Sequence, residues 1–228
     1  NTMTIPLPNV NPKHFRSMLR FIYSGDTSFL ASPAAEHPSI GGNRATGANS
    51  MNVDTHVARS RLAQQRYKDF QDLLVVANEF GCWKLKLIIE AQLINKHLTG
   101  ASMIDLLLLA REHECVMLKD AGIRMAAKNV DELFGHPECG RLIACTELMT
   151  EVHVMRKGDV PSDGTVNDEF SKMSVMELYE SLDGKDNVKV EAYMDRPSLL
   201  ELVRSAAAET PAETPADTPT EMDTEESK

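Results

Sequence analysis

Two pairs of histidine and cysteine are the residues whose types could bind a metal ion in this chain. One residue separates His113 from Cys115, and two residues separate His136 from Cys139. Imidazole nitrogen and thiolate sulfur are the usual ligands of structural zinc sites, but neither spacing is a standard one. On a helix His113 and Cys115 would lie about 200° apart, so they could not readily share one ion. We interpret the pairs as surface histidines and buried cysteines, and expect no metal ion and no cofactor.

Residue patterns typical of catalysis are also weak. The sequence contains no Gly-rich phosphate loop, no nucleophile elbow and no HExxH motif. Cys82 would be activated by a histidine only through tertiary contacts that the sequence does not reveal. Asp131 and Glu132 are better explained as charges at the start of a helix, where the helix dipole favours acidic residues. We expect no enzyme activity and no catalytic residue.

The composition limits the compartment and the partners. Among 228 residues 42% are hydrophobic but only 5% aromatic, so Leu, Met, Ala and Val must fill the core. Four scattered cysteines do not make a disulfide framework, which favours a cytoplasmic or nuclear location. No run of 18 apolar residues occurs, so no membrane span is expected. The net charge of −10 argues against nucleic acid as the partner.

The elements that would position these side chains are helices. Near the start of the chain, one apolar stripe at helical spacing is formed by Phe15, Met18, Leu19, Ile22 and Tyr23. Asn11 is suited to cap this helix, Pro12 to occupy its first position and Gly25 to end it. The segment TIPLPNV before it has the pattern of one short strand.

Further helices follow closely after residue 68. The first carries the stripe Phe70, Leu73, Leu74, Ala77 and Phe80 and ends at Gly81. We expect a second from about Trp83 to His97, a third capped by Ser102, a fourth around 117–125, another starting at Asn129, and one over about 138–152. Short connections between them predict antiparallel helical hairpins. The expected fold class is therefore mainly α.

Composition divides the chain into seven segments. Residues 26–67 are rich in Gly, Ala, Ser, Asn and Pro and are expected to form a disordered insert, although the far end, ARSRLAQQRYK, could join the next helix. The tail holds seven acidic residues and one lysine, which is −6 of the net charge of −10, and its AETP repeats predict disorder. The segments are a strand and helix (1–25), the insert (26–67), helices (68–98), a helical extension (99–153), a linker (154–170), a helical hairpin (171–204) and the acidic tail (205–228).

The hairpin at 171–204 contains two short amphipathic helices, at 174–182 and 197–204. Ser174 and Glu177 have the spacing of a capping box, and Asp195 begins the second helix. The pair weakly resembles a SAP motif, which often binds DNA. However, five basic and seven acidic residues give the hairpin a net charge of −2, the wrong sign for phosphate. Packing on the main domain or on a partner is the simpler interpretation.

Two groups of residues carry a resemblance to the BTB/POZ family. Ile5, Leu7, Asn9 and Val10, followed by the stripe Phe15 to Tyr23 and by Ser24-Gly25, resemble its strand, helix and closing turn. Leu73-Leu74-x-x-Ala77-x-x-Phe80 with Leu85 and Leu93, and Ser102-x-x-Asp105-Leu106-Leu107 with Ala110-x-x-His113, resemble the later helices. The signature positions, all expected to be structural, are Phe15, Leu19, Ile22, Tyr23, Gly25, Leu73, Leu74, Ala77, Leu85, Leu107 and Ala110.

The resemblance implies a partial BTB/POZ-like domain over 1–25 and 68–98, with the helices of 99–153 as its extension. It implies a non-enzymatic adaptor that brings a substrate to a cullin-based ubiquitin ligase, homodimerises through the domain, and uses 102–152 to extend the cullin-binding surface. The first half of the family domain has no counterpart here. We therefore expect a fragment of a longer protein, or else a processed or mispredicted product, and expect this chain alone to be impaired in both roles.

Two other interpretations remain. A nuclear DNA- or chromatin-associated protein would use the SAP-like hairpin. An α-solenoid would need helix pairs repeated at a fixed period, and the sequence has none. In the tail, Thr210, Thr214 and Thr218 precede prolines and could be phosphorylated, but a solvated acidic tail is the simpler interpretation.

Overall fold

The computed structural model describes residues 10–30, 51–157, 169–182, 190 and 193–208, and the side chains of its longest helix from residue 60 onward. Within these ranges the protein is mainly helical, as predicted, and contains no strand. The elements up to residue 128 are α1 (Pro12–Ser24), the 3-10 helix η1 (Ser28–Leu30), α2 (Met51–Glu79), α3 (Trp83–His97), α4 (Met103–Glu112) and α5 (Val116–Lys128). The later helices are α6 (Val130–Gly135), α7 (Cys139–Ile143), α8 (Thr146–Lys157), α9 (Glu169–Lys172), α10 (Val175–Leu182) and α11 (Arg196–Ala208).

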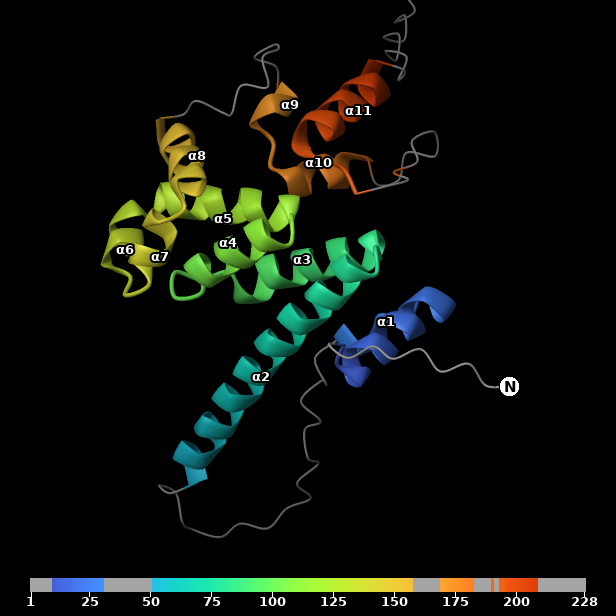
Figure 1. Cartoon of the computed structure of the whole chain (residues 1–228), viewed down its shortest axis with the longest axis vertical. Helices are drawn as coiled ribbons and strands as arrows, with labels where there is room; N and C mark the ends of the chain where they lie inside the picture. Colours follow the sequence, from blue (N-terminus) through green and yellow to red (C-terminus); the bar gives the residue numbers. More distant parts are fainter. Residues whose placement is uncertain (1–9, 31–50, 158–168, 183–189, 191–192, 209–228) are drawn as a thin grey trace, which may run out of the picture.

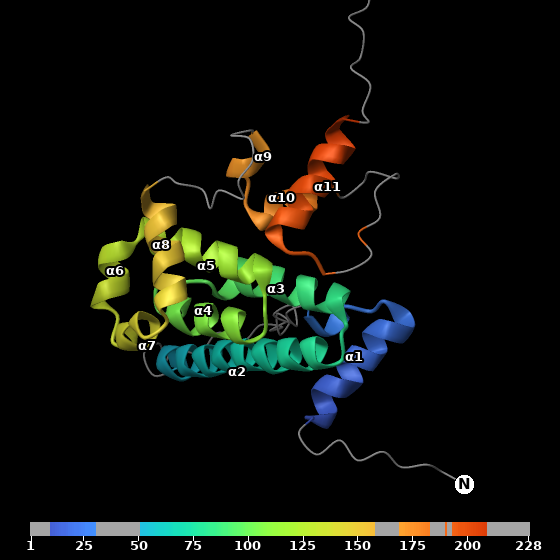
Figure 2. The ribbon, with the colours of Figure 1, turned by 45° about the horizontal axis from the view of Figure 1, so that its top comes forward.

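Helix α5 is the centre of the packing. Figure 2 shows α2 along one side of the group formed by α3, α4 and α5, with α10 and α11 on the opposite side. Three apolar clusters each take residues from α5: Leu118 packs with α1 to α4, Ile123 with α4 and α6 to α8, and Met117 with α10 and α11. A helix that is apolar on several faces is typical of a buried position, and α5 therefore joins all three clusters.

Helix ends follow the local signals of the sequence. Asn11 caps α1, with its side-chain oxygen accepting the Lys13 N–H at 2.9 Å. Gly25 ends the same helix with a φ of 65°, a left-handed conformation that glycine adopts without a Cβ clash. Ser174 and Glu177 form the predicted capping box, each accepting the backbone N–H of the other. The predicted caps at these helix ends are confirmed. The prediction that Ser102 caps the third helix is wrong, because neither Ser102 before α4 nor Asn129 before α6 makes a side-chain capping bond.

The boundaries of the predicted insert and linker need correction. Residues 51–67 belong to α2 rather than to a disordered insert, because this stretch has no Pro or Gly and continues the helix that carries Phe70. Its far end does join the next helix, as the alternative interpretation had it. η1 also falls within the predicted insert, while 31–50 lie outside the described residues. The predicted linker over 154–170 is shorter than expected, because α8 extends to Lys157 and α9 begins at Glu169.

Three further predictions differ from the structure or lie beyond it. The expected helix over 138–152 is divided into α7 and α8, and this break lets Leu142 and Leu148 both reach the second cluster. α11 continues past 204 to Ala208, because the Ala-rich end favours helix and Ala206 is buried. The expected strand falls almost entirely on residues 1–9, and the rest of the acidic tail on 209–228, all outside the described residues.

The C-terminal hairpin is held on α5 by one buried carboxylate. Asp120 accepts hydrogen bonds from the Arg124 Nε at 2.9 Å and from the Val175 N–H, the first residue of α10, at 3.1 Å. Its other oxygen lies 3.4 Å from the guanidinium of Arg196 at the start of α11. One side chain of α5 therefore caps α10 and pairs with α11, so α9 to α11 pack on the main domain, as the simpler interpretation of the hairpin predicted.

Candidate protein-binding face and adjoining cavity

Helix α1 is rotated relative to the prediction. Its inward positions are His14, Met18 and Phe21, with Met18 only 2% exposed, whereas Ile22 is 54% and Tyr23 85% exposed. The buried set is the predicted stripe moved back by one residue, which is about 100° around a helix. Ile22 and Tyr23, which the sequence places on the apolar stripe, are therefore exposed in this chain. A histidine takes part in the buried face, so hydrophobicity alone could not reveal the rotation.

An apolar face runs along the outer side of α1 as a result. We define the α1 face as Phe15, Leu19, Ile22, Tyr23 and Phe80. Phe15 and Leu19 are half-buried, and the ring of Phe15 lies 5.1 Å from that of Phe80 at the end of α2. Residues at i, i+4 and i+7 share one side of a helix, so these side chains are contiguous. Figure 1 shows α1 beside the end of α2 and apart from α4 to α11.

The basic residues beside the α1 face are largely paired. The Lys13 Nζ lies 2.7 Å from Asp69, and the Arg20 guanidinium lies 2.5 Å from Asp26. The backbone N–H of Ser28 bonds to Asp26 and holds the pKa of its carboxyl below the ordinary value. These pairs reduce the positive charge of α1 and leave a surface that is more apolar than its sequence suggests.

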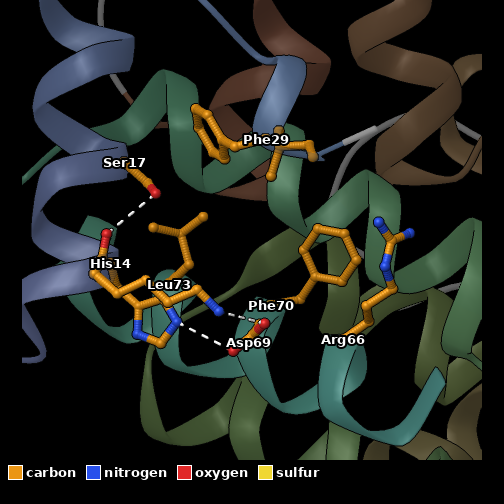
Figure 3. Close-up of a pocket in the computed structure, with 9 residues that line it drawn as sticks. His14, Ser17, Phe29, Arg66, Asp69, Phe70 and Leu73 are labelled. Carbon is orange, nitrogen blue, oxygen red and sulfur yellow. Dashed lines mark hydrogen bonds and ion pairs between the residues drawn. The ribbon is translucent and has the colours of Figure 1, made fainter. Parts of the chain in front are cut away.

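A cavity of about 140 Å³ lies between α1, η1 and α2 (Figure 3). Its apolar wall consists of Phe29, Leu30, Phe70 and Leu73. Its polar wall consists of Lys13, His14, Ser17, Arg66 and Asp69. The cavity therefore combines an aromatic lining with cationic side chains.

His14 is the unusual member of this wall. It is only 3% exposed, and neither ring nitrogen has a hydrogen-bond partner among the described residues. Its Nε2 lies 3.5 Å from Asp69 Oδ1, toward which the ring points in Figure 3. Burial would raise the pKa of Asp69, but hydrogen bonds from Lys13 and Gln65 outweigh it and lower that pKa. Asp69 is therefore a charged carboxylate opposite a buried imidazole.

The same wall does not form a catalytic relay. Ser17 Oγ donates to the backbone carbonyl of Lys13 at 3.2 Å rather than to His14, so no base activates the hydroxyl. Cys82, the thiol considered from sequence, is half-buried against the first apolar cluster.

The candidate metal ligands lie in different surroundings. Cys115 packs in the first apolar cluster and Cys139 in the second. The Nδ1 of His136 accepts the Glu138 N–H at 3.1 Å, which leaves Nε2 to donate to the Ala101 carbonyl at 3.1 Å. Burial raises the pKa of the Cys115 thiol, which disfavours thiolate. In the described part of the chain, no group of three or more His, Cys, Asp or Glu residues could hold a metal ion.

Most signature positions lie in the interior. Leu73, Leu74, Ala77 and Leu85 are buried in the first cluster with Ala110, and Leu107 is buried in the second. Phe15 and Leu19 are half-buried, Ile22 and Tyr23 are exposed, and Gly25 ends α1. The structure thus brings the α1 positions together on a surface and the later positions together in a core.

The sequence did not reveal a buried polar network around α3. Glu90 is completely buried, and its carboxyl accepts from the Leu118 N–H and from the hydroxyl of Tyr193. The Lys86 ammonium donates to Asn78 Oδ1 and to two backbone carbonyls, and lies 4.0 Å from the centre of the Tyr193 ring. An acidic residue within the apolar run LIIEAQL was the available signal, because a buried charge needs partners.

No protein-family model matches this chain, and no curated protein or solved structure matches it either. No helix in the described ranges is long and apolar enough to cross a membrane.

Proposed function

We propose that this chain is a non-enzymatic protein-interaction module and that the α1 face is a contact surface. The observation that carries the proposal is the exposure of Ile22 and Tyr23 next to the half-buried Phe15 and Leu19. Contiguous exposed apolar side chains of this kind mark interaction sites more often than scattered ones do. The internal pairing of Lys13 and Arg20 favours an apolar partner surface over a strongly acidic one.

The occupant of the α1 face is, in this proposal, a second copy of the chain. The BTB/POZ resemblance implies homodimerisation. Because Lys13 and Arg20 are each paired with an aspartate of their own chain, two copies of the α1 face would repel each other only weakly. Five side chains are far fewer than the roughly 20–30 residues per partner of a standard interface, so the affinity is expected to be weak. The chain should be mainly monomeric when dilute and should self-associate reversibly as its concentration rises.

Sedimentation velocity over a range of concentrations tests self-association. The double variant Ile22→Ser, Tyr23→Ser should remain monomeric where the unchanged chain associates. Leu62→Ser is the matched control, because Leu62 is an exposed leucine on α2 outside the α1 face. The absence of any concentration dependence, or association that the double variant retains, would contradict the α1 face as the contact.

The finer proposal is a substrate adaptor for a cullin-based ubiquitin ligase. Phe134 and Ile143, on α6 and α7, are 56% and 51% exposed within the 102–152 region where the resemblance implies cullin contact. Calorimetric titration with a cullin amino-terminal domain is the test. We expect weak saturable binding that Phe134→Ser, Ile143→Ser reduces and Leu62→Ser leaves unchanged. No binding, or equal binding by the double variant, would remove the cullin assignment without affecting the self-association test.

Contacts of the C-terminal arginines favour this function over DNA binding. The Arg196 guanidinium donates to the carbonyls of Ser171 and Met173, and Arg204 donates to the Ser171 hydroxyl. Guanidinium groups that bond within the hairpin are less available to contact phosphate.

A further inference from the structure

We propose that the C-terminal hairpin, formed by α9 to α11, docks on α3 and α5 in a pH-dependent way: it is held while the buried carboxyl of Glu90 is protonated and is released as that proton is lost. The hairpin helices α10 and α11 lie on the opposite side of α3 to α5 from α2 (Figure 2). The inference therefore does not depend on the α1 face or on self-association.

The hairpin has an apolar core of its own. In the third apolar cluster, Met117 of α5 is the only buried member from outside the hairpin among the described residues, and the others lie on α10 and α11. Leu178 of α10 and Leu199 of α11 are both completely buried in this cluster. The two helices can therefore remain packed on each other when their contact with the main domain opens.

Polar groups make much of the contact between the hairpin and the main domain. Asp120 of α5 accepts the Val175 N–H at 3.1 Å, and the hydroxyl of Tyr193, which precedes α11, donates to Glu90 of α3 at 2.8 Å. Units of one chain that meet through a polar contact are expected to move relative to each other, unlike units joined by a large apolar one. Docking therefore depends on a few polar groups, one of which can change its charge.

Glu90 is the buried acid that the hairpin covers. Leu87 and Ile94, three positions before and four positions after it, share its side of α3 and pack against the third cluster. The carboxyl is completely buried and accepts from the Tyr193 hydroxyl and from the Leu118 N–H at the start of α5. Release of the hairpin removes Tyr193 and the cover over this side of α3, so water reaches the carboxyl.

The protonation state of Glu90 changes the free energy of docking, because burial disfavours the charged form of a carboxyl. Burial is the largest effect on this group and raises its pKa from 4.5 to about 7, against the hydrogen bonds from Leu118 and Tyr193. The Tyr193 hydroxyl can donate or accept, so its hydrogen bond with the carboxyl forms in either protonation state. Because the docked state holds the proton more tightly than the released state, docking is strongest at low pH and weakens as pH rises through about 7.

The other ionisable groups near Glu90 come from α3, the start of α5, α10 and the segment before α11. They are Lys86, Cys115, Tyr179 and Tyr193. Burial raises the pKa of the thiol and of both phenols, so these three groups stay neutral in the range where Glu90 titrates. The Lys86 ammonium donates to Asn78 Oδ1 and to two backbone carbonyls, so it compensates the charge of Glu90 only through space.

Amide hydrogen exchange of the full chain at pH 5 and pH 8, corrected for the pH dependence of exchange in unstructured peptides, tests the inference. We expect the amides of α10 and α11 to exchange through an opening that leaves the amides of α4 protected. Low urea should change this opening less than global unfolding, because less surface is exposed. Protection in the hairpin should fall by up to about 70-fold from pH 5 to pH 8, which is the change expected when the pKa of Glu90 returns from about 7 to 4.5 on release.

Two variants identify the titrating group. Glu90→Gln keeps the shape of the side chain but does not titrate, so protection of the hairpin should no longer depend on pH. His113→Gln is the matched control, because histidines ordinarily titrate in this range and the His113 carbonyl accepts from Lys86. This control should keep the full pH dependence.

Three outcomes would overturn the inference. In the unchanged chain, the hairpin amides would exchange only together with those of α4, or would have the same protection at pH 5 and pH 8. In the variants, the loss of protection would persist in Glu90→Gln or disappear in His113→Gln. The first two outcomes are measured on the unchanged chain, so a variant that fails to fold leaves the test decisive.

Discussion

The hydroxyl of Tyr193 donates a hydrogen bond of 2.8 Å to the buried carboxyl of Glu90, although 103 positions separate them in sequence. The same hydroxyl accepts the Val116 N–H at 2.5 Å, and the other Glu90 oxygen accepts the Leu118 N–H at 2.9 Å. Cys115, at the N-cap of α5, makes no side-chain capping bond. Two distant side chains therefore satisfy backbone donors at the start of the central helix.

Replacing Tyr193 with Phe should lower the free energy of unfolding by about 1–3 kcal/mol, because the partly buried N–H of Val116 and the buried carboxyl of Glu90 each lose a partner. Urea denaturation measures this change. Tyr23→Phe is the control, since Tyr23 is largely exposed on α1 and should show no change. Equal effects in the two variants would contradict the role of Tyr193 as a cap of α5.

Glu90 should make stability fall as pH rises. Burial is the largest effect on this group and raises its pKa from 4.5 to about 7, against the opposing bonds from Leu118 and Tyr193. Because the folded protein holds this proton more tightly than the unfolded chain, the stabilisation is complete below about pH 4.5 and lost as pH approaches 7. The loss is about 3 kcal/mol.

Urea denaturation across this pH range checks the Glu90 prediction. Glu90→Gln removes the titrating group, so its stability should vary less with pH than that of the unchanged chain. Glu180→Gln, an exposed position on α10, should keep the full pH dependence. If the stability of Glu90→Gln fell with rising pH as steeply as that of the unchanged chain, the pH dependence would come from other groups.

Asp120→Ala should loosen the C-terminal hairpin. The change leaves the Arg196 guanidinium and the Val175 N–H without this partner, and breaking a buried pair costs about 3 kcal/mol or more. In this variant the rate of amide hydrogen exchange should increase more in α10 and α11 than in α3, relative to the unchanged chain. Asp105→Ala breaks only the exposed contact with Arg141 and should cost less than about 1 kcal/mol. Unchanged exchange in α10 and α11 would show that apolar contacts alone hold the hairpin.

Two glycines should respond in opposite directions to alanine. At Gly122 in α5 an added Cβ would lie 2.7 Å from Leu107 Cδ2 of α4, so Gly122→Ala should destabilise by about 1–3 kcal/mol. At Gly140 in α7 nothing lies within 4 Å of such a Cβ. Gly140→Ala should stabilise by up to about 1 kcal/mol. Thermal unfolding of both variants measures the contrast, and a stabilising Gly122→Ala would mean that α4 and α5 pack less closely.

Helix α1 should be anchored by Met18 and not by Ile22. Met18→Ala empties a buried position and should cost about 2–5 kcal/mol, while Ile22→Ala should cost less than about 0.5 kcal/mol. Chemical denaturation of the pair distinguishes the observed rotation of α1 from the stripe expected by sequence. A larger loss of unfolding free energy in Ile22→Ala than in Met18→Ala would show that Ile22, and not Met18, faces the core.

Local signals predicted the helices well. Asn11 and Gly25 mark the ends of α1, and α3 has the predicted bounds, because capping and apolar spacing act within a few residues. The bounds of the insert were predicted less accurately, because they rested on residue composition and not on apolar spacing. The composition of residues 31–50 predicts an insert, but residues 51–67 contain no Pro or Gly and extend α2.

The sequence by itself therefore determined the helical class and most helix ends, because hydrogen bonds within a helix join residues four apart. Only the tertiary structure decided which side of α1 is buried, since Phe15, Met18 and Ile22 are all apolar and His14 becomes inward only against α2. It also decided the partners of Glu90 and Asp120, which lie 103 and 55 positions away at Tyr193 and Val175. Such contacts depend on how whole helices pack, and no local pattern encodes them.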